Sequence, residues 1–203
     1  MDLLEFARGP AMHWALVTMV AGCFWRGAHF AMRRGERELY WARKGLHVPR
    51  LRWQLDSYAM HAGMLIAMFG FAPHILFIKT LIGVGWPSVP TAIVLGGAVV
   101  SVASMVAVLI HRIMTPEPSI FSAFDDYFTW SIVFISMTTG LMAYPHLGGG
   151  ALLPPYSAFL TAHLLAVELL MIWLPFGKLV HVAFMPTLQV TMLVRRALRT
   201  TAR

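Results

Sequence analysis

An apolar segment in the middle of the chain decides the fold: residues 91–114 read TAIVLGGAVVSVASMVAVLIHRIM. Arg112, close to its end, is its only Asp, Glu, Lys or Arg. A helix of about 20 such residues crosses the hydrocarbon core of a bilayer. The segment lacks the two-residue alternation of an outer-membrane strand, so it predicts a membrane-spanning α-helix.

Four further apolar runs of similar length flank this segment, and glycine- and proline-rich stretches separate them. They cover residues 11–31, 58–84, 124–144 and 156–185. Together with residues 91–114 they predict an all-α integral membrane protein of five transmembrane helices. We expect residues 1–203 to form a single membrane domain with a haem-binding helix bundle, for the reasons given below.

The composition excludes several classes of protein. Of the 203 residues, 58% are apolar and only 12% are charged, which is about half the charged share of an average soluble domain. A soluble enzyme of this size cannot bury so much apolar surface, and a disordered chain would not carry it. The one cysteine, Cys23, excludes an internal disulfide framework and any metal site built from cysteines alone.

The positive charge gathers at the ends of apolar runs. Most of the sixteen Lys and Arg residues lie in 33–52 and 195–203, a distribution typical of membrane proteins and not of nucleic-acid binding. With the N-terminus outside and the C-terminus in the cytoplasm, both clusters and Arg112 fall inside, as the positive-inside rule requires. We therefore expect a multi-pass protein of the bacterial or archaeal cytoplasmic membrane, in contact with lipid and not with nucleic acid.

Five of the nine histidines need an explanation above all, because ionisable groups are costly in a membrane: His61, His74, His111, His163 and His181. His163 and His181 are 18 residues apart, so an unbroken helix would present both on one face, about 27 Å apart. Low-spin haem b needs two axial imidazoles, which facing helices can supply. In the expected topology His61 and His181 lie at the inner side and pair on one iron, while His163 lies at the outer side with His74.

The pairing of His74 with His163 requires a distorted second helix. His61 and His74 are 13 residues apart, which is about 220° of rotation on an ideal helix. Pro73 and Gly70 are suited to a kink or a local unwinding that would turn His74 round. The alternative is a single haem, with His74 near a quinone or in water.

Three segments resemble the cytochrome b gamma subunit of respiratory nitrate reductase. The family includes membrane cytochromes of sulfite-reduction-associated, heterodisulfide-reductase-type and transmembrane electron-transfer complexes. Residues 175–181 (PFGKLVH), with His163 upstream, resemble its last helix, and residues 61–70 (HAGMLIAMFG) resemble its second helix. Arg112 with residues 116–125 resembles the connection between its third and fourth helices. The resemblance extends over residues 26–194.

The resemblance implies two haems b, oxidation of quinol towards the outer face, and a cytoplasmic iron–sulfur protein and catalytic subunit that receive the electrons. By position, His61 and His181 match the ligands of the inner haem, and His163 matches a ligand of the outer haem. Phe71 stands where nitrate reductase gamma subunits place the remaining ligand. Residues 73–78 and 85–87 resemble relatives from electron-transfer complexes of sulfate reducers, which favours His74 as the substitute.

Four other polar side chains are candidates for the cofactor sites. Arg26 and Arg112 are suited to binding haem propionates, with snorkelling to the interface as the alternative. Lys79 and Glu168 are candidates for a quinone site. Their alternatives are an interfacial anchor for Lys79 and a hydrogen bond to a neighbouring helix for Glu168.

The sequence thus predicts a membrane-anchoring haem b subunit of a respiratory complex, which carries electrons between the quinone pool and a cytoplasmic partner. The chemistry of the terminal substrate would belong to that partner, so whether the chain is itself an enzyme stays open. The alternative is a haem-free transporter or channel in which the histidines form a proton or metal path.

Overall fold

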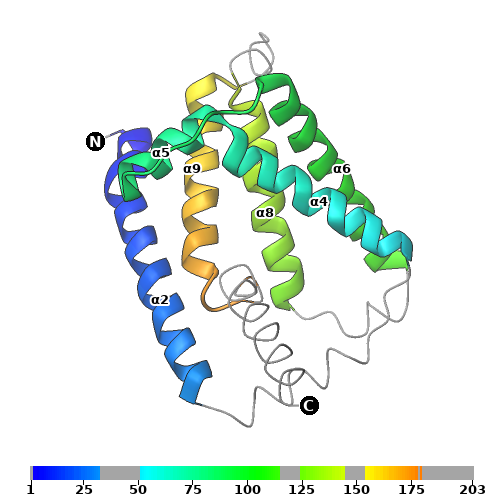
Figure 1. The fold of residues 1–203 in the computed structure, drawn as a ribbon, viewed down its shortest axis with the longest axis horizontal. Helices are drawn as coiled ribbons and strands as arrows, with labels where there is room; N and C mark the ends of the chain where they lie inside the picture. Colours follow the sequence, from blue (N-terminus) through cyan, green and yellow to red (C-terminus); the bar gives the residue numbers. More distant parts are fainter. Residues whose placement is uncertain (1, 33–50, 115–123, 145–153, 178, 180–203) are drawn as a thin grey trace, which may run out of the picture. The chain divides into compact units, whose positions relative to one another are not determined.

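The computed structural model describes residues 2–32, 51–114, 124–144, 154–177 and 179 (Figure 1). In these residues the chain is helical and contains no strand, which confirms the all-α prediction there. The chain forms two compact units, one of Met1–Leu46 with Val167–Arg203 and one of His47–Ala166.

In the residues that the structure describes, the unit His47–Ala166 contains four complete helices and the first part of a fifth. They are α4 (Leu51–Gly70), α5 (Ala72–Ile82), α6 (Thr91–Met114), α8 (Phe124–Met142) and α9 (Tyr156–Trp173), of which residues 156–166 belong to this unit. The expected helix 91–114 occurs with the same bounds as α6. The expected helix 124–144 occurs as α8, which ends two residues earlier.

Helices α4 and α6 cross at small residues. A Cβ added to Gly63 would collide with the carbonyl oxygen of Gly97, so a side chain at Gly63 would push the two backbones apart. The Ser101 hydroxyl donates a hydrogen bond of 2.9 Å to the carbonyl oxygen of Met60 across the same crossing. Close contact of this kind lets helices associate where no hydrophobic force acts between them, as in a bilayer.

The run 58–84, expected as one span, is broken into two helices. The axes of Leu55–Gly70 and Ala72–Ile82 differ by 64°, and Figure 1 shows the bend where α4 passes into α5. Phe71 between them is extended, with φ −81° and ψ 126°. The break follows from Pro73, which has no N–H for the carbonyl oxygen of Phe69 four residues earlier and whose ring would clash with that carbonyl in a continuous helix.

The unit Met1–Leu46 with Val167–Arg203 begins with three consecutive helical segments. They are α1 (Leu3–Phe6), the π-helical turn η1 (Ala7–Ala11) and α2 (Met12–Met32). The expected helix 11–31 is thus present as α2. Gly22 of α2 lies against the chain after α9, since a Cβ added there would come within 2.6 Å of Pro175 Cγ.

The fifth helix is shorter than the expected run 156–185, because α9 ends at Trp173. The N–H groups of Phe176 and Gly177 both donate to the carbonyl oxygen of Trp173, which closes a turn. Pro175 cannot donate to the carbonyl four residues before it, so the helix stops there. The expectation of one unbroken face from His163 to His181 does not hold across this turn, and His181 itself lies outside the described residues.

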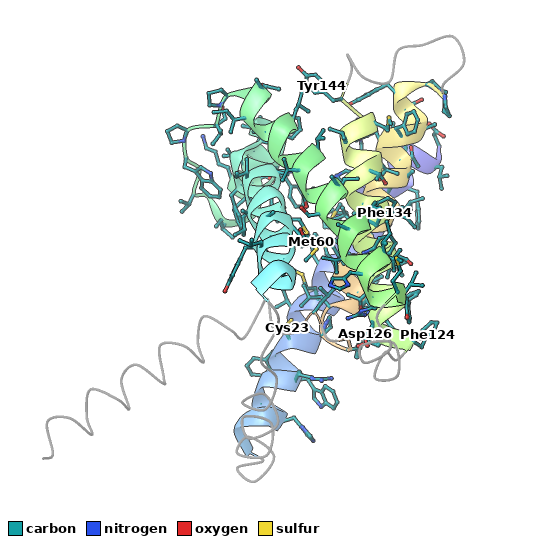
Figure 2. The ribbon with its side chains drawn as sticks, turned by 90° about the vertical axis from the view of Figure 1, so that its right-hand side faces the viewer. Cys23, Met60, Phe124, Asp126, Phe134 and Tyr144 are labelled. Carbon is teal, nitrogen blue, oxygen red and sulfur yellow. The ribbon has the colours of Figure 1, made fainter. Side chains whose placement is uncertain are left out.

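Two described helices, Thr91–Met114 and Tyr156–Trp173, are long and apolar enough to cross a membrane, and the bent pair α4–α5 makes a third if it is one span. Large apolar side chains on the described helices are exposed. Phe124, for example, projects from the start of α8 with 74% of its surface accessible (Figure 2). Such a surface is compatible with contact with lipid.

Candidate functional site

Two histidine side chains from different helices face each other in the unit His47–Ala166. His74 lies in the first turn of α5 and His163 lies in α9. The centroids of their imidazole rings are 6.1 Å apart and the ring planes differ by 24°. Both side chains are half-buried.

The distance between the two ring centroids matches that of two imidazoles bound end-on to one metal atom, a geometry in which both Nε2 atoms must also point at the metal. A metal–imidazole bond is about 2 Å long, and the ring centre lies ~1 Å beyond the bonded nitrogen. Two such halves place the ring centroids roughly 6 Å apart when both ligands bind from opposite sides. This value agrees with the distance between His74 and His163.

Hydrogen bonds fix the tautomer of both rings when these are neutral. Nδ1 of His74 donates to the carbonyl oxygen of Ala67 at 2.9 Å. Nδ1 of His163 donates to the carbonyl oxygen of Ser136 at 2.8 Å. Because a carbonyl oxygen only accepts, each Nδ1 carries a proton, and in the neutral ring Nε2 keeps the lone pair that binds a metal. A backbone carbonyl on the other nitrogen is the usual support of a metal-binding histidine.

The described residues supply two imidazole donors at this point. Among the described residues, no three His, Cys, Asp or Glu side chains gather closely enough to hold a metal ion. A site of two imidazoles is therefore incomplete for zinc, which takes three or four protein ligands. Two axial imidazoles do complete the coordination of a haem iron, whose other four ligands come from the macrocycle.

Hydrogen bonds from the loop that follows α5 stabilise the break between α4 and α5. The Trp86 indole N–H donates to the carbonyl oxygen of Phe69 at 2.6 Å, where the missing N–H of Pro73 would otherwise bond in a helix. The N–H of Val89 donates to the carbonyl oxygen of Gly70 at 2.9 Å. Two carbonyl groups that the break uncovers are thereby satisfied, which fixes the direction in which α5 leaves.

Phe71 forms the corner of the break and also contacts the ligand candidate. Its ring meets that of His74 edge to face, with centroids 5.4 Å apart and an interplanar angle of 81°. Phe71, which by resemblance stands where nitrate reductase gamma subunits place their remaining ligand, thus packs against His74, the substitute that the sequence analysis favours.

Gly140 makes room for His163 on the surface of α8. A Cβ added to Gly140 would lie 2.8 Å from Cε1 and 2.9 Å from Nδ1 of that imidazole. Ser136, one turn earlier on α8, is buried and accepts the hydrogen bond from His163. The sequence analysis missed Ser136, Gly140 and Trp86. The spacing of Ser136 and Gly140 by four residues, two small side chains on one helix face, is a signal that could have identified the first two.

The second expected pair is only half described. His61 lies on α4 with an exposed side chain, and its Nδ1 donates to the carbonyl oxygen of Ser57 at 2.7 Å. Its expected partner, His181, is outside the described residues, so the structure leaves the pair of His61 and His181 as a prediction.

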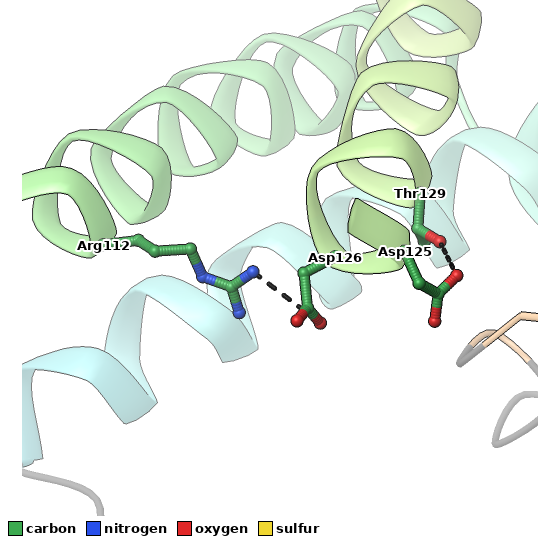
Figure 3. Close-up of polar contacts among 4 residues, drawn as sticks. All are labelled: Arg112, Asp125, Asp126 and Thr129. Atoms are coloured by element: carbon green, nitrogen blue, oxygen red, sulfur yellow. Dashed lines mark hydrogen bonds and ion pairs between the residues drawn. The ribbon is translucent and has the colours of Figure 1, made fainter. Parts of the chain in front are cut away.

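Arg112, expected near a propionate, is close to a carboxylate of its own chain. Its Nη1 lies 3.8 Å from Oδ1 of Asp126, and its guanidinium lies 6.0 Å from the centre of the Tyr127 ring. Figure 3 shows this pair beside Asp125, which accepts a hydrogen bond of 3.2 Å from the Thr129 hydroxyl. Both acidic residues stand in the first turn of α8, where they also complement the helix dipole.

The remaining candidates occupy three different environments. Arg26 is exposed and its Nη1 donates to the carbonyl oxygen of Phe176 at 3.4 Å. Lys79 is exposed at the end of α5, and its carbon chain covers Gly85. Glu168 is only 4% exposed, and its Oε1 has no hydrogen-bond partner among the described residues.

Comparison with known proteins gives one distant relative. A curated protein of Nitratidesulfovibrio vulgaris strain Hildenborough, described simply as a protein, is 26% identical over 125 residues, which cover 62% of this chain and 53% of that protein. The chain thus spans about half the length of the curated relative that it matches. No protein-family model and no solved structure matches the chain.

Proposed function

We propose that this chain is the haem b subunit of a quinone-linked respiratory complex and anchors that complex in the membrane. The observation that carries the proposal is the pair of His74 and His163, whose imidazole rings lie 6.1 Å apart. On this proposal the chain transfers electrons from quinol to a cytoplasmic iron–sulfur protein, which passes them to a catalytic subunit.

The described residues would hold the cofactor in three ways. His74 and His163 would hold the haem iron, and the carbonyl groups of Ala67 and Ser136 would keep both rings oriented. Because Gly140 has no side chain, it would leave the space beside α8 that the imidazole of His163 occupies. When bound, haem b supplies one-electron redox chemistry, and the apolar helices around it would exclude water and so set its potential.

The electron balance of the proposed reaction is simple. One quinol is oxidised to quinone and gives up two electrons and two protons. The protons leave at the outer side, and the electrons pass one at a time to the iron–sulfur partner, which is reduced. Lys79 and Glu168 are the residues proposed for the quinone site. The buried Oε1 of Glu168 supports this role, because a buried carboxyl oxygen without a partner is able to take a hydrogen bond from a hydroxyl group.

The proposal includes the finer expectations from the sequence. Five spans, with the N-terminus outside and the C-terminus in the cytoplasm, would place the second haem between His61 and His181 at the inner side. Arg26 and Arg112 remain the proposed contacts of the propionates, and in the case of Arg112 a propionate would compete with Asp126. The complex would lie in the cytoplasmic membrane of a bacterium or archaeon.

The test is the absorption spectrum and the haem content of the purified full-length chain. We expect a b-type spectrum on reduction, and we expect His74→Ala and His163→Ala each to lose one haem per chain. His13→Ala is the matched control, because Nδ1 of His13 also bonds to a carbonyl oxygen, that of Gly9, but lies on α2. A colourless protein would instead favour the haem-free transporter or channel, and equal haem content in all variants would remove both residues from the ligand set.

A further inference from the structure

Three hydroxyl side chains close together on α8 bond back to carbonyl groups of their own helix. The hydroxyl groups of Ser136 and Thr138 donate to carbonyl oxygens four residues earlier, at 2.8 and 2.7 Å. The Thr139 hydroxyl donates to the carbonyl oxygen of Ile135 at 2.5 Å. Hydrogen bonds of this kind are a common way for serine and threonine to satisfy their hydroxyl groups inside a helix.

The two threonines each reach a second carbonyl oxygen, and these second contacts end on different residues. The Thr138 hydroxyl lies 3.2 Å from the carbonyl oxygen of Ile135. The Thr139 hydroxyl lies 3.3 Å from the carbonyl oxygen of Ser136. That carbonyl oxygen also accepts the hydrogen bond of 2.8 Å from Nδ1 of His163. Thr139, and not Thr138, therefore shares an acceptor with the proposed ligand of the haem.

The Ser136 carbonyl oxygen has more donors than lone pairs. Within the α-helix Phe124–Met142 it is also the acceptor for the N–H of Gly140, four residues later. The N–H of Gly140, the Nδ1–H of His163 and the hydroxyl of Thr139 thus compete for the two lone pairs of one oxygen. Ser136 is buried, and a buried hydrogen bond responds more strongly to its neighbours than one in water. Each donor therefore weakens the bonds that the other two make.

The strength of the bond at Nδ1 affects the other nitrogen of the His163 ring. A strong hydrogen bond from Nδ1–H to a carbonyl oxygen increases the basicity of the imidazole as a metal ligand. A more basic ligand stabilises the oxidised metal more than the reduced one, because the oxidised metal carries the larger charge. A hydroxyl group that competes for the Ser136 carbonyl oxygen has the opposite effect and favours the reduced metal.

We propose that Thr139 is a positioning residue that weakens the hydrogen bond between His163 and Ser136 and so raises the reduction potential of a haem bound by His163. Thr139 acts through the Ser136 carbonyl group and the imidazole ring. The effect on the hydrogen bond is a property of the chain alone. The effect on the potential rests on the proposed function.

Three variants of the full-length chain isolate the hydroxyl group of Thr139. Thr139→Val removes this group and keeps the shape of the side chain, whereas Thr139→Ser keeps a hydroxyl. Thr138→Val is the matched control, because it removes a neighbouring hydroxyl that bonds to Phe134 and Ile135 and not to Ser136.

Two measurements are made on each variant. Nuclear magnetic resonance of the dithionite-reduced chain with isotope-labelled histidine gives the chemical shift of the Nδ1 proton of His163, which is assigned by its absence in His163→Gln. A redox titration followed by absorption gives the midpoint potential of the haem. The first measurement does not require a bound haem, since both the haem-free chain and low-spin ferrous haem are diamagnetic.

We expect the Nδ1 proton of His163 to move downfield in Thr139→Val, as its hydrogen bond becomes stronger, and the midpoint potential to fall in the same variant. Thr139→Ser should restore both values, and Thr138→Val should leave both unchanged. An unchanged proton shift in Thr139→Val, or an equal change in Thr138→Val, would overturn the proposal. A changed proton shift with an unchanged potential would overturn its redox part.

Failure of the proposed function would give a different result. A chain without haem would contradict that function, while the proton shift would still decide whether Thr139 competes with His163 for the Ser136 carbonyl oxygen.

Discussion

The imidazole rings of His74 and His163 lie with their centroids 6.1 Å apart and their planes 24° apart, although one belongs to the short helix α5 and the other to α9. Two local features make this approach possible. The break at Phe71 redirects α5, and Gly140 opens the surface of α8 to His163. Each ring is held through Nδ1 by a backbone carbonyl, so in the neutral rings each Nε2 keeps the lone pair that can bind a metal.

The role of Gly140 is testable by adding a single methyl group. In Gly140→Ala the new Cβ would lie 2.8 Å from Cε1 of His163, and overpacking of this kind costs about 1–3 kcal/mol. We expect a lower haem content and a lower melting temperature in detergent. The control is Gly96→Ala, since nothing lies within 4 Å of a Cβ at that position. Equal haem content in the two variants would show that His163 does not depend on the space at Gly140.

Trp86 is expected to position His74 without touching it. Trp86→Phe keeps an aromatic ring beside Phe69 but removes the N–H that bonds to its carbonyl oxygen at 2.6 Å. A lost hydrogen bond of this kind costs about 0.5–1.5 kcal/mol, and the direction of α5 should become less fixed. We expect a changed midpoint potential and a broader electron paramagnetic resonance spectrum of the bound haem. Trp14→Phe, at an exposed position of α2, should leave both unchanged, and equal spectra for the two variants would contradict the role.

The crossing of α4 and α6 should depend on Gly63. In Gly63→Ala the added Cβ would collide with the carbonyl oxygen of Gly97 and lie 2.8 Å from Cβ of Ser101. Because backbone cannot yield as a flexible side chain does, we expect a loss of stability of about 1–3 kcal/mol, measured by thermal unfolding in detergent. Gly9→Ala is the control with open space. A melting temperature equal to that of the control would mean that the helices do not cross so closely.

Arg112 and Asp126 are expected to be weakly coupled. Their side chains are 3.8 Å apart, and that of Arg112 is 30% exposed, so the pair should contribute no more than about 1 kcal/mol. Arg112→Gln and Asp126→Asn should each destabilise the protein, and the double variant should lose less than the sum, as a double-mutant cycle measures. If the losses of stability in the two single variants simply add, Arg112 does not interact with Asp126. A shift of the haem potential in Arg112→Gln alone would support the proposed contact between Arg112 and a propionate.

The all-helical fold and the helix 91–114 could be predicted because a long apolar run without charges has few other stable forms in a membrane. The break in the run 58–84 was suggested by Gly70 and Pro73. Its direction could not be predicted, because it depends on hydrogen bonds from Trp86 and Val89, which lie beyond α5. A proline shows where a helix loses a bond but not which distant group replaces it.

The end of the fifth helix is a second limit of the sequence analysis. The apolar run continues past Pro175, so hydropathy alone extended the helix, whereas the described helix ends at Trp173. The roles of Gly22 and Gly140 cannot be predicted from one helix alone, because each glycine lies against the ring of a residue in another segment. The spacing of residues along one helix predicts which side chains share a face. The residues that this face contacts depend on how the helices pack.

The most direct measurement of the central claim is the electron paramagnetic resonance spectrum of the oxidised, purified full-length chain. The account predicts a low-spin ferric signal of bis-imidazole haem, part of which becomes high-spin or disappears in His74→Ala and in His163→Ala alike, while His13→Ala keeps the full signal. A full low-spin signal in both ligand variants, or no haem signal in the unmodified chain, would contradict the account.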